Sequence, residues 1–412
     1  MNQQNDCAAD CTNKKRLLLL GGGHAEIPLI QAAQSLGYFV ITTGNAREGL
    51  GHPYADKNVF ADFSDKNAML ELAKAEKVSA VCSGCNDFAL LSTVYVCEKL
   101  GLPGHDSYET SLQIHHKDKY RALAEKLNIV TPRARIVHNL DEFKQVIGLG
   151  ETTSDKPLQY PLIVKPVDLT GGKGIHRANN ESEALIAYED AVRRTRENHI
   201  VVEEFIVGTN HGFSAFLING KVAFYFADNE QYFLNKYMVS GANCPSTTSS
   251  KGLQQLVSDS EKIAAHLHLV DGILHIQYIE KADGTPVIIE ICRRPPGDLY
   301  IKFVKYATDV DYPLAIIQAE TGATPTIEKA TQKPFLRHCI MATETGTVRD
   351  IYFAPEIQKN IVEKLLWYKP GETIDDILYY KAGIVFMEFD SEAEMAEKTT
   401  KMTEYIRIVT DN

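Results

Sequence analysis

Strand-like and helix-like segments alternate along residues 16–104, and this alternation limits the choice of fold more than any other feature of the chain. Short apolar runs at 16–20, 38–42 and 78–82 alternate with segments of helical apolar spacing at 27–36, 65–76 and 88–100. Strands that are joined through helices by short connections pair in parallel, with helices on both faces of the sheet. We therefore expect a parallel α/β domain at residues 14–115, after a polar tail at 1–13.

The rest of the chain has a different pattern, with strands that follow one another directly. The clearest pair is 272–280 and 285–292, which flanks Ala282-Asp283-Gly284, a common hairpin turn. Residues 299–322 are expected to be helical. A last unit at 326–412 combines strands with a helix at 391–406. The whole chain thus reads as α/β followed by α+β.

Composition and charge exclude several classes of protein. Hydrophobic residues make up 44% of the chain and charged residues 24%, as in ordinary soluble proteins, and the net charge of -11 argues against a general nucleic-acid binder. No stretch approaches the ~20 apolar residues of a membrane span, and no signal peptide is apparent. Eight scattered cysteines indicate reduced thiols, so we expect a cytoplasmic protein. We interpret the Cys82 and Cys85 pair as small loop residues rather than as a zinc or redox site.

A glycine turn, Gly21-Gly22-Gly23, follows the first expected strand and opens a helix, where a dinucleotide fingerprint would lie. However, Glu26 occupies the third glycine position of that fingerprint. The second strand also ends at Gly44 without the carboxylate that would bind a ribose. We therefore expect this turn to serve the fold, or to donate N–H groups to a substrate anion, rather than to bind NAD.

A lysine and a glycine-rich loop are the strongest sign of chemistry. An apolar strand-like run delivers Lys165, and after Pro166 the chain enters a loop that contains Gly171, Gly172, Lys173 and Gly174. A lysine on a strand beside a loop rich in free backbone N–H groups suits an oligophosphate. Taken alone, the loop could equally be a plain surface hairpin.

Other motifs, in a fixed order around this segment, favour the phosphate interpretation. Asp118-Lys119 opens a helix before it, an apolar strand running into Glu203-Glu204-Phe205-Ile206 follows it, and Gln277 and a Glu290-Ile-Cys-Arg-Arg294 strand come later. In this order the chain resembles the ATP-grasp superfamily, particularly its carboxylate–amine ligases and biotin-carboxylase-like members. The resemblance covers nearly the whole chain.

The resemblance implies a division into domains and a nucleotide site. A two-lobed ATP-grasp domain would occupy 116–325, with the small lobe at about 116–202 and the large lobe at about 203–325, before a small C-terminal α+β domain at 326–412. The cofactor would be ATP. The residues implied to bind it are Lys119 and Lys165 on the phosphates, the lid residues Gly171, Gly172, Lys173 and Gly174, the adenine hinge Glu203, Glu204, Phe205 and Ile206, and His211 just beyond the hinge.

The resemblance also implies a metal site and a catalytic arginine. Glu290 would bind Mg²⁺, with Mn²⁺ as the alternative ion, while Gln277 replaces the family's second glutamate and Cys292 replaces its asparagine. A thiol is a poor magnesium ligand, so we expect a site with fewer negative charges that fully binds one metal. Arg294 would hold an acyl-phosphate or a substrate carboxylate and, with Lys165, would form the catalytic pair.

The function that follows is ATP-dependent ligation of a small-molecule carboxylate to an amine through an acyl-phosphate, with release of ADP and phosphate. The alternatives are a bicarbonate-dependent carboxylating or carbamoyl-type enzyme, and a nucleotide-binding module with little catalysis. A homodimer through helices of the first domain is also expected, without nucleic acid or membrane. Substrate contacts are expected from Arg294, the turn at 295–298 with Tyr300, residues 229–232 and residues 241–246.

Overall fold

The first part of the chain is a parallel sheet with its helices. The structure, a computed structural model, describes residues 14–150, 156–169, 172–328 and 330–411. The sheet has the order β3-β2-β1-β4, and every neighbouring pair is parallel. This confirms the α/β expectation. The elements are β1 (Arg16–Leu20), α2 (Ile27–Ser35), β2 (Phe39–Thr43), β3 (Lys57–Asn58), α3 (Lys66–Ala75), β4 (Ala80–Cys82), α4 (Asp87–Leu100) and α5 (Tyr108–His115), with short 3-10 turns at His24–Glu26 and His52–Tyr54.

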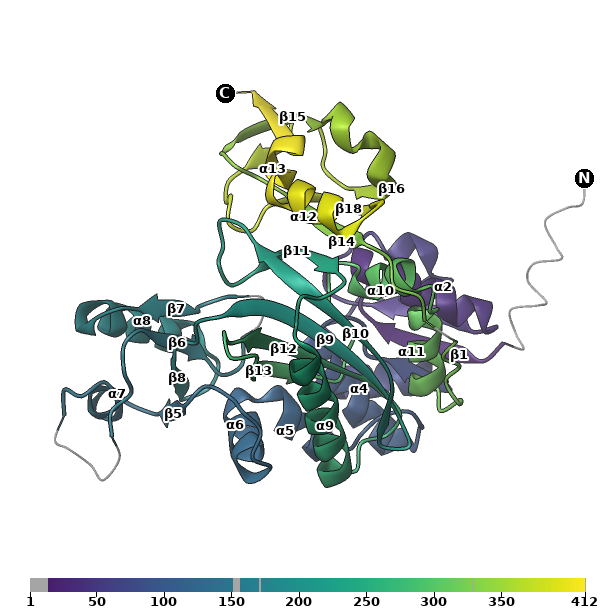
Figure 1. The fold of residues 1–412 in the computed structure, drawn as a ribbon. Coiled ribbons are helices and arrows are strands. Elements are labelled where there is room, and N and C mark those ends of the chain that lie inside the picture. Colours follow the sequence, from purple (N-terminus) through teal and green to yellow (C-terminus); the bar gives the residue numbers. More distant parts are fainter. Residues whose placement is uncertain (1–13, 151–155, 170–171, 329, 412) are drawn as a thin grey trace, which may run out of the picture.

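A small antiparallel lobe follows and projects from the body of the molecule (Figure 1). Its four strands have the order β5-β8-β6-β7, and α7 and α8 lie with them. The apolar residues of these strands pack with the two helices in one buried cluster. The elements are α6 (Lys117–Lys126), β5 (Ala134–Val137), α7 (Leu140–Val146), β6 (Leu162–Pro166), β7 (His176–Ala178), α8 (Glu181–Arg194) and β8 (Ile200–Glu204).

An eight-stranded sheet forms the centre of the molecule, in the order β13-β12-β9-β10-β11-β14-β18-β16. The expected hairpin is confirmed, because β12 and β13 pair antiparallel around a turn that Lys281 N and Thr285 O close. The elements are β9 (Thr209–Ile218), β10 (Lys221–Tyr232), β11 (Val239–Cys244), α9 (Ser250–Leu267), β12 (Gly272–Glu280), β13 (Pro286–Cys292), α10 (Tyr300–Thr308), α11 (Tyr312–Glu320) and β14 (Phe335–Met341).

The two faces of this sheet carry different residues. Along β9, Phe213, Ala215 and Leu217 pack in the cluster that contains α9, whereas Phe216 packs in the cluster of α10, α11 and the N-terminal sheet. Successive strand residues point to opposite faces, so the even-numbered residues of β9 share the face of Phe216. Gly212 therefore lies on the face opposite α9.

The segment 299–322 is helical as expected, but the chain forms two helices there, α10 and α11. Asp309 has a φ of 62° and ends α10, and the carboxylate of Asp311 accepts a hydrogen bond from Leu314 N to cap α11. Pro313 lies in the first turn of α11, where its missing N–H costs nothing. These local caps interrupt an apolar pattern that is helical on both sides.

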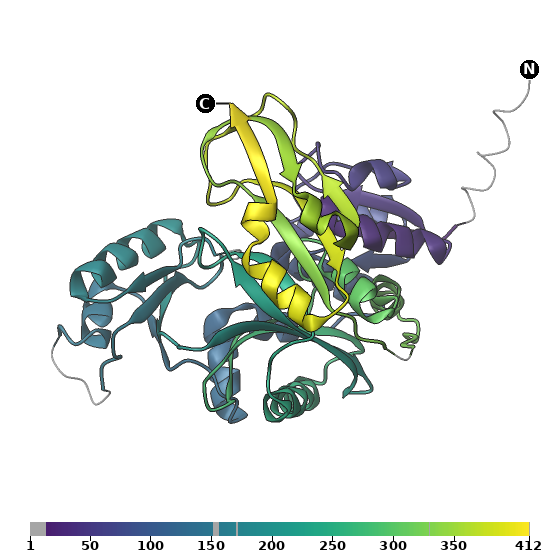
Figure 2. The same ribbon diagram turned by 45° about the horizontal axis from the view of Figure 1, so that its top comes forward.

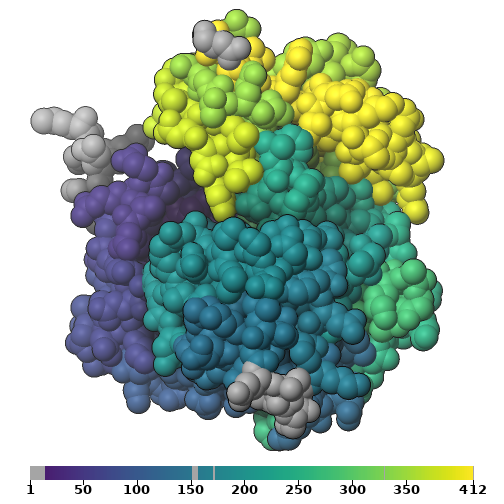
Figure 3. All heavy atoms as spheres, turned by 90° about the vertical axis from the view of Figure 1, so that its left-hand side faces the viewer, coloured from purple at the N-terminus to yellow at the C-terminus, as the bar shows by residue number. Residues whose placement is uncertain are grey.

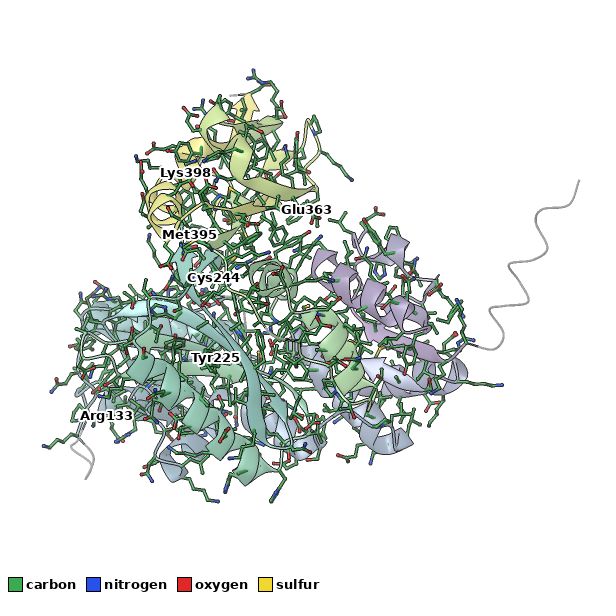
Figure 4. All side chains as sticks on the ribbon, turned by 45° about the vertical axis from the view of Figure 1, so that its right-hand side comes forward. Arg133, Tyr225, Cys244, Glu363, Met395 and Lys398 are labelled. Atoms are coloured by element: carbon green, nitrogen blue, oxygen red, sulfur yellow. The ribbon has the colours of Figure 1, made fainter. Side chains whose placement is uncertain are left out.

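The C-terminal segment extends the central sheet instead of standing apart from it. Strands β14, β18 and β16 continue the sheet beyond β11, while β17-β15-β19 form a separate three-stranded sheet. Figure 2 shows this unit above the central sheet, and Figure 4 shows Cys244 of β11 near Met395 of α12. The elements are β15 (Gly346–Phe353), a 3-10 helix (Pro355–Asn360), β16 (Ile361–Leu366), β17 (Thr373–Ile374), β18 (Lys381–Glu388), α12 (Glu392–Thr400), α13 (Met402–Tyr405) and β19 (Ile406–Asp411).

The parts of the molecule adjoin one another on the face that Figure 3 shows. In Figure 3 the small lobe fills the front of the molecule, with the C-terminal unit above it and the N-terminal domain beside it. No helix in the described part of the chain combines the length and apolar character that crossing a membrane requires. The polar tail expected at 1–13 and the loop residue Gly171 lie outside the described residues.

Candidate functional site

A cavity of about 860 Å³ lies where the small lobe, the central sheet and the N-terminal domain meet. Most of the residues expected to form the site line it, although they come from segments far apart in the sequence. The sequence-derived candidates among the lining residues are Lys165, Gly172, Glu203, Glu204, Phe205, Ile206, Gln277, Glu290 and Arg294.

Residues 204–208 form one wall of the cavity after the end of β8. The backbone N–H of Phe205 donates to Pro161 O at 3.0 Å, and the guanidinium of Arg177 lies 4.2 Å from the centre of the Phe205 ring. Gly208 lies so close to β12 that a Cβ there would be 2.2 Å from the carbonyl oxygen of Glu280. This segment therefore presents backbone groups and apolar side chains to the cavity along a fixed path.

The Glu203 carboxylate does not point along this wall but holds two cations. Lys165 Nζ lies 2.7 Å from Glu203 Oε2, and Arg121 Nη2 lies 2.7 Å from Glu203 Oε1. Burial raises the pKa of Glu203, but Arg121 and Lys165 outweigh it and hold that pKa below its usual value. Burial lowers the pKa of Lys165, and Glu203 opposes this shift. Two cations and one anion leave a net positive charge beside the cavity.

Lys117 lines the cavity, whereas Lys119 does not. Lys117 Nζ donates to Leu169 O at 2.9 Å and lies 4.0 Å from Glu290 Oε1, while Lys119 Nζ lies 3.7 Å from Glu109 Oε1 on the surface. A separation of two residues along a helix corresponds to a rotation of about 200°, so the two lysines point to opposite sides of α6. Of these two lysines, the structure thus brings Lys117 to the cavity and leaves Lys119 outside it.

The glycine loop is only partly at the cavity. Gly172 lines it with a φ of +75°, and a Cβ there would be 2.5 Å from Tyr237 O, so the loop lies against the segment between β10 and β11. Lys173 is exposed and does not line the cavity. Gly174, with a φ of +70°, packs beside Pro166 instead of the cavity.

His211 is not among the lining residues because it lies on the other face of β9. Its ring stacks on Tyr278 with centroids 5.2 Å apart, and its Nε2 lies 2.7 Å from the hydroxyl of Thr209. Burial lowers the pKa of His211. The structure therefore does not bring His211 together with the other expected nucleotide-binding residues.

Arg294 is held at the cavity by the N-terminal domain. Its Nε and Nη2 donate to the two oxygens of Asp87 at 3.0 and 2.7 Å, and Asp87 is the first residue of α4. Burial alone would lower the pKa of Arg294, but Asp87 more than compensates and raises it. The guanidinium is thus charged, fixed in place and a lining group of the cavity.

Comparison with known proteins identifies the domain that carries this cavity. Residues 117–298 match the family model of the ATP-grasp domain. The chain contains an ATP-grasp domain. The matched range begins at Lys117 and ends at Asp298, and so includes every lining residue named above except Asp87, which belongs to the N-terminal domain.

Relatives of known function share part of this chain. A formate-dependent phosphoribosylglycinamide formyltransferase from Prochlorococcus marinus is 27% identical over 47% of the chain and 48% of its own length. A carbamoyl phosphate synthase large chain from Clostridium botulinum is 20% identical over 90% of the chain and 35% of its own length. The chain thus spans about half or less of the length of these relatives.

Solved structures share the fold over nearly their whole length. An L-amino acid ligase from Bacillus licheniformis has a TM-score of 0.78 and 20% identity, and covers 97% of this chain and 99% of its own. A phosphoribosylglycinamide synthetase from Anaerococcus prevotii has a TM-score of 0.74 and 22% identity, with 96% and 100% covered. The ATP-grasp domain and both flanking parts therefore have the fold of these proteins.

Several lining residues of the ATP-grasp cavity were not foreseen from the sequence. Asp228 lines it from β10 and could have been found, because that strand runs on to Tyr232. Glu230, on the same strand, lies in the range 229–232 that the sequence predicts to contact substrate. Nothing in the sequence indicates that Lys117, Asp87 and Arg337 line the cavity, since their partners lie far away in the sequence.

Proposed function

We propose that this chain is an ATP-dependent ligase that joins a carboxylate to an amine through an acyl-phosphate and releases ADP and phosphate. One observation carries the proposal: a single cavity of about 860 Å³ collects a backbone wall, buried lysines, a carboxylate and a fixed guanidinium. Cavities of about 300–1,000 Å³ are the size in which proteins enclose cofactors and small ligands. The cavity thus has room for a nucleotide beside a small substrate.

The nucleotide would lie along residues 204–208 with its phosphates toward Lys117 and Lys165. The positive charge that remains on the Lys165, Glu203 and Arg121 group suits the phosphate oxygens. Gly172 brings the glycine loop over this end of the cavity, where it would shield the phosphates from water. We place Lys117 in the role that the sequence suggested for Lys119, because only Lys117 lines the cavity.

The residues present fit a magnesium ion that also binds the phosphates. Glu290 offers a carboxylate, and the amide nitrogen of Gln277 donates to Glu230, which leaves the Gln277 carbonyl oxygen free for a metal. Burial raises the pKa of Cys292 to about 11, so its thiol stays protonated and is no ligand. Within the described residues no group of three His, Cys, Asp or Glu could hold a metal alone. Magnesium would supply charge neutralisation on the transferring phosphoryl group.

Arg294 would orient the anionic end of the substrate carboxylate or the acyl-phosphate. Asp87 already holds the Arg294 guanidinium in place, so little reorganisation of this side chain is needed when an anion binds. Catalysis in this site would come mostly from positioning and electrostatic stabilisation. The substrate carboxylate would attack the γ-phosphoryl group, and the amine would then capture the acyl-phosphate.

We also propose that the enzyme acts in the cytoplasm on small molecules, without nucleic acid or membrane, and forms a homodimer. The six cysteines within the described residues are all free, and five of them are buried, which suits a reducing compartment. The net charge of -11 opposes nucleic-acid binding. Light scattering of the purified protein would test the homodimer.

An ADP-release assay tests the ligase proposal. The purified chain would be incubated with ATP, Mg²⁺ and the twenty standard L-amino acids in pairs, since a structural relative is an L-amino acid ligase. Formate, acetate and succinate would extend the set of acids. We expect ADP release that requires both an acid and an amine and is lost in Lys165→Ala.

Two other results would contradict the ligase. ADP release that depends on bicarbonate alone would favour the carboxylating alternative. ATP binding without ADP release for every acid and amine would indicate a nucleotide-binding module.

A further inference from the structure

A row of residues crosses the floor of the cavity on four neighbouring strands. Glu290 of β13 pairs with Gln277 of β12, Gln277 with Gly212 of β9, and Gly212 with Asp228 of β10. Residues directly opposite in an antiparallel sheet share a face. Because Gly212 has no side chain, the Asp228 carboxylate leans over it, and a Cβ at Gly212 would lie 2.7 Å from Asp228 Oδ2.

The two oxygens of this carboxylate differ in their partners. Asp228 Oδ2 accepts a hydrogen bond from the hydroxyl of Tyr300 at 2.6 Å. Asp228 Oδ1 is buried and has no hydrogen-bond partner within the described residues, although the residue lines the cavity. Buried polar atoms are normally paired, so this oxygen is an acceptor left open for a donor that the protein does not supply.

Glu230 increases the negative charge at this point but offers no open acceptor. Glu230 follows Asp228 by two residues on β10, so the two side chains lie on the same face of the sheet. Its Oε1 accepts from Gln277 Nε2 at 2.8 Å, and its Oε2 accepts from the hydroxyl of Tyr232 at 2.6 Å. Burial and the neighbouring Glu230 raise the pKa of Asp228 to about 7. The pair therefore favours a cation that can donate a hydrogen bond to a single free oxygen.

An ammonium group fits this description better than a divalent metal. Metal ions such as magnesium take several oxygen ligands at once, and the described residues hold no group of three acids arranged for one. An ammonium needs one strong acceptor and nearby negative charge, which Asp228 and Glu230 provide together. The amine substrate of a ligase is the cation that must enter this cavity.

We propose that Asp228 binds the ammonium group of the amine substrate and is the general base that removes its proton. This inference rests on the ligase activity proposed above. Amino groups have pKa values of about 8 to 10 in model compounds, so the amine arrives protonated and cannot attack until it loses a proton.

The proposed step balances in protons and electrons. Asp228 Oδ1 takes one proton from the R–NH₃⁺ group, and the freed nitrogen lone pair attacks the carbonyl carbon of the acyl-phosphate. A C–N bond forms, the C–O bond to phosphate breaks, and the phosphate leaves with that electron pair. The departing phosphate takes the second proton from nitrogen, and Asp228 later releases its own proton to solvent.

Ionisable groups from several elements surround Asp228. Arg337 lowers its pKa, as does the hydrogen bond from Tyr300, while Glu230 raises it. These groups leave the base ionised above about pH 7, which is the state that can accept a proton. The ionisable neighbours are Glu230 and Tyr232 on β10, His211 on β9, Cys244 on β11, His275 and Tyr278 on β12, Tyr300 on α10 and Arg337 on β14.

Asp228→Asn separates amine activation from acyl-phosphate formation. Both enzymes would be tested with the acid and amine that give the fastest ADP release, and then with hydroxylamine in place of the amine. Hydroxylamine is largely uncharged at pH 7, so it attacks without a base. We expect amide formation to fall about 10²- to 10⁴-fold and hydroxamate formation to change by less than about threefold. Asp283→Asn, in the exposed hairpin turn, is the matched control and should leave both rates unchanged.

Tyr300→Phe gives a second test, because it should shift a pH profile that a purely structural role of Asp228 would leave unchanged. Loss of the hydroxyl removes a donor from Asp228 Oδ2, so the pKa of Asp228 should rise further. The rise of the amide-forming rate with pH should therefore move to higher pH, while the hydroxamate-forming rate keeps its wild-type profile.

Three outcomes would overturn the proposal in distinguishable ways. Equal loss of amide and hydroxamate in Asp228→Asn would place the residue before amine attack. Equal retention of both would remove it from the reaction. If the wild-type chain makes neither product from any acid, the ligase itself fails, and the inference fails with it.

Discussion

Lys165 Nζ lies 2.7 Å from Glu203 Oε2 in a fully buried pair, so the lysine that the sequence marks for phosphate is held by a carboxylate from the next strand. Strands β6 and β8 are antiparallel neighbours, and the two residues project to the same side of the small lobe. Arg121 completes the group from α6. This arrangement fixes the ammonium at the cavity, and the three side chains together keep a net positive charge.

Glu203→Ala should be among the most destabilising single changes in the small lobe. It leaves Lys165 and Arg121 buried without their anion, and breaking a buried ion pair in this way costs about 3–5 kcal/mol. Lys165→Met is the comparison, because the Arg121–Glu203 pair survives in it. Urea denaturation of the three proteins measures the effect, and equal stability of both variants would contradict it.

Lys117→Ala should weaken nucleotide binding far more than Lys119→Ala. A hydrogen bond to a charged group contributes about 1.5–3 kcal/mol, so the dissociation constant for ATP should rise about 10- to 100-fold in Lys117→Ala. Lys119 pairs with Glu109 on the surface and does not line the cavity, so its variant should bind like the wild type. Calorimetric titration with ATP and Mg²⁺ measures both, and a reversed order would favour Lys119 as the phosphate ligand.

Gln277→Glu should make the stability of the protein depend on magnesium. The change replaces the donor that Glu230 accepts at 2.8 Å with a second carboxylate, so two acids repel each other when no metal is bound. We expect a lower melting temperature in EDTA and a larger rise on adding Mg²⁺ than in the wild type. Gln254→Glu, at an exposed position of helix α9, is a control for added charge. The absence of any Mg²⁺-dependent difference would argue against a metal at this position.

Asp87→Asn should remove a contribution to stability that depends on pH. Burial raises the pKa of Asp87, but Arg294 and His115 lower it more, so the folded value lies below the usual one. The contribution of such a group is present above the unfolded pKa of about 3.9 and is lost as pH falls through the folded value. The gap in unfolding free energy between wild type and variant should be constant near neutral pH and shrink in acid. Denaturant titrations at a series of pH values would show a pH-independent gap if Asp87 were not ionised.

Gly212→Ala should disturb the cavity floor without replacing a charged residue. The new Cβ would meet Asp228 Oδ2 at 2.7 Å, and overpacking of this kind costs about 1–3 kcal/mol. We also expect amide formation to fall more than hydroxamate formation, since Asp228 must move. Gly220→Ala, at an open turn with a φ of +71° away from the cavity, introduces backbone strain that Gly212→Ala does not, and so controls for a general loss of stability. Equal loss of the two products would contradict this expectation.

The sequence by itself determined the fold class and the order of the chemistry along the chain. Alternating strands and helices specify a parallel sheet, and Lys165, Gly172, residues 204–206, Glu290 and Arg294 all line one cavity. These features are local, because periodicity and turn residues act over a few positions. A resemblance that rests on several ordered motifs therefore follows from the residues alone.

Only the tertiary structure decided which side chain of each motif faces the cavity and what it meets there. About half a helical turn separates Lys117 from Lys119, and one strand position separates His211 from Gly212. The partners of the cavity residues come from distant segments, as Asp87 does for Arg294 and Tyr300 for Asp228. Such contacts depend on how helices and sheets pack against one another, which the local pattern of residues does not encode.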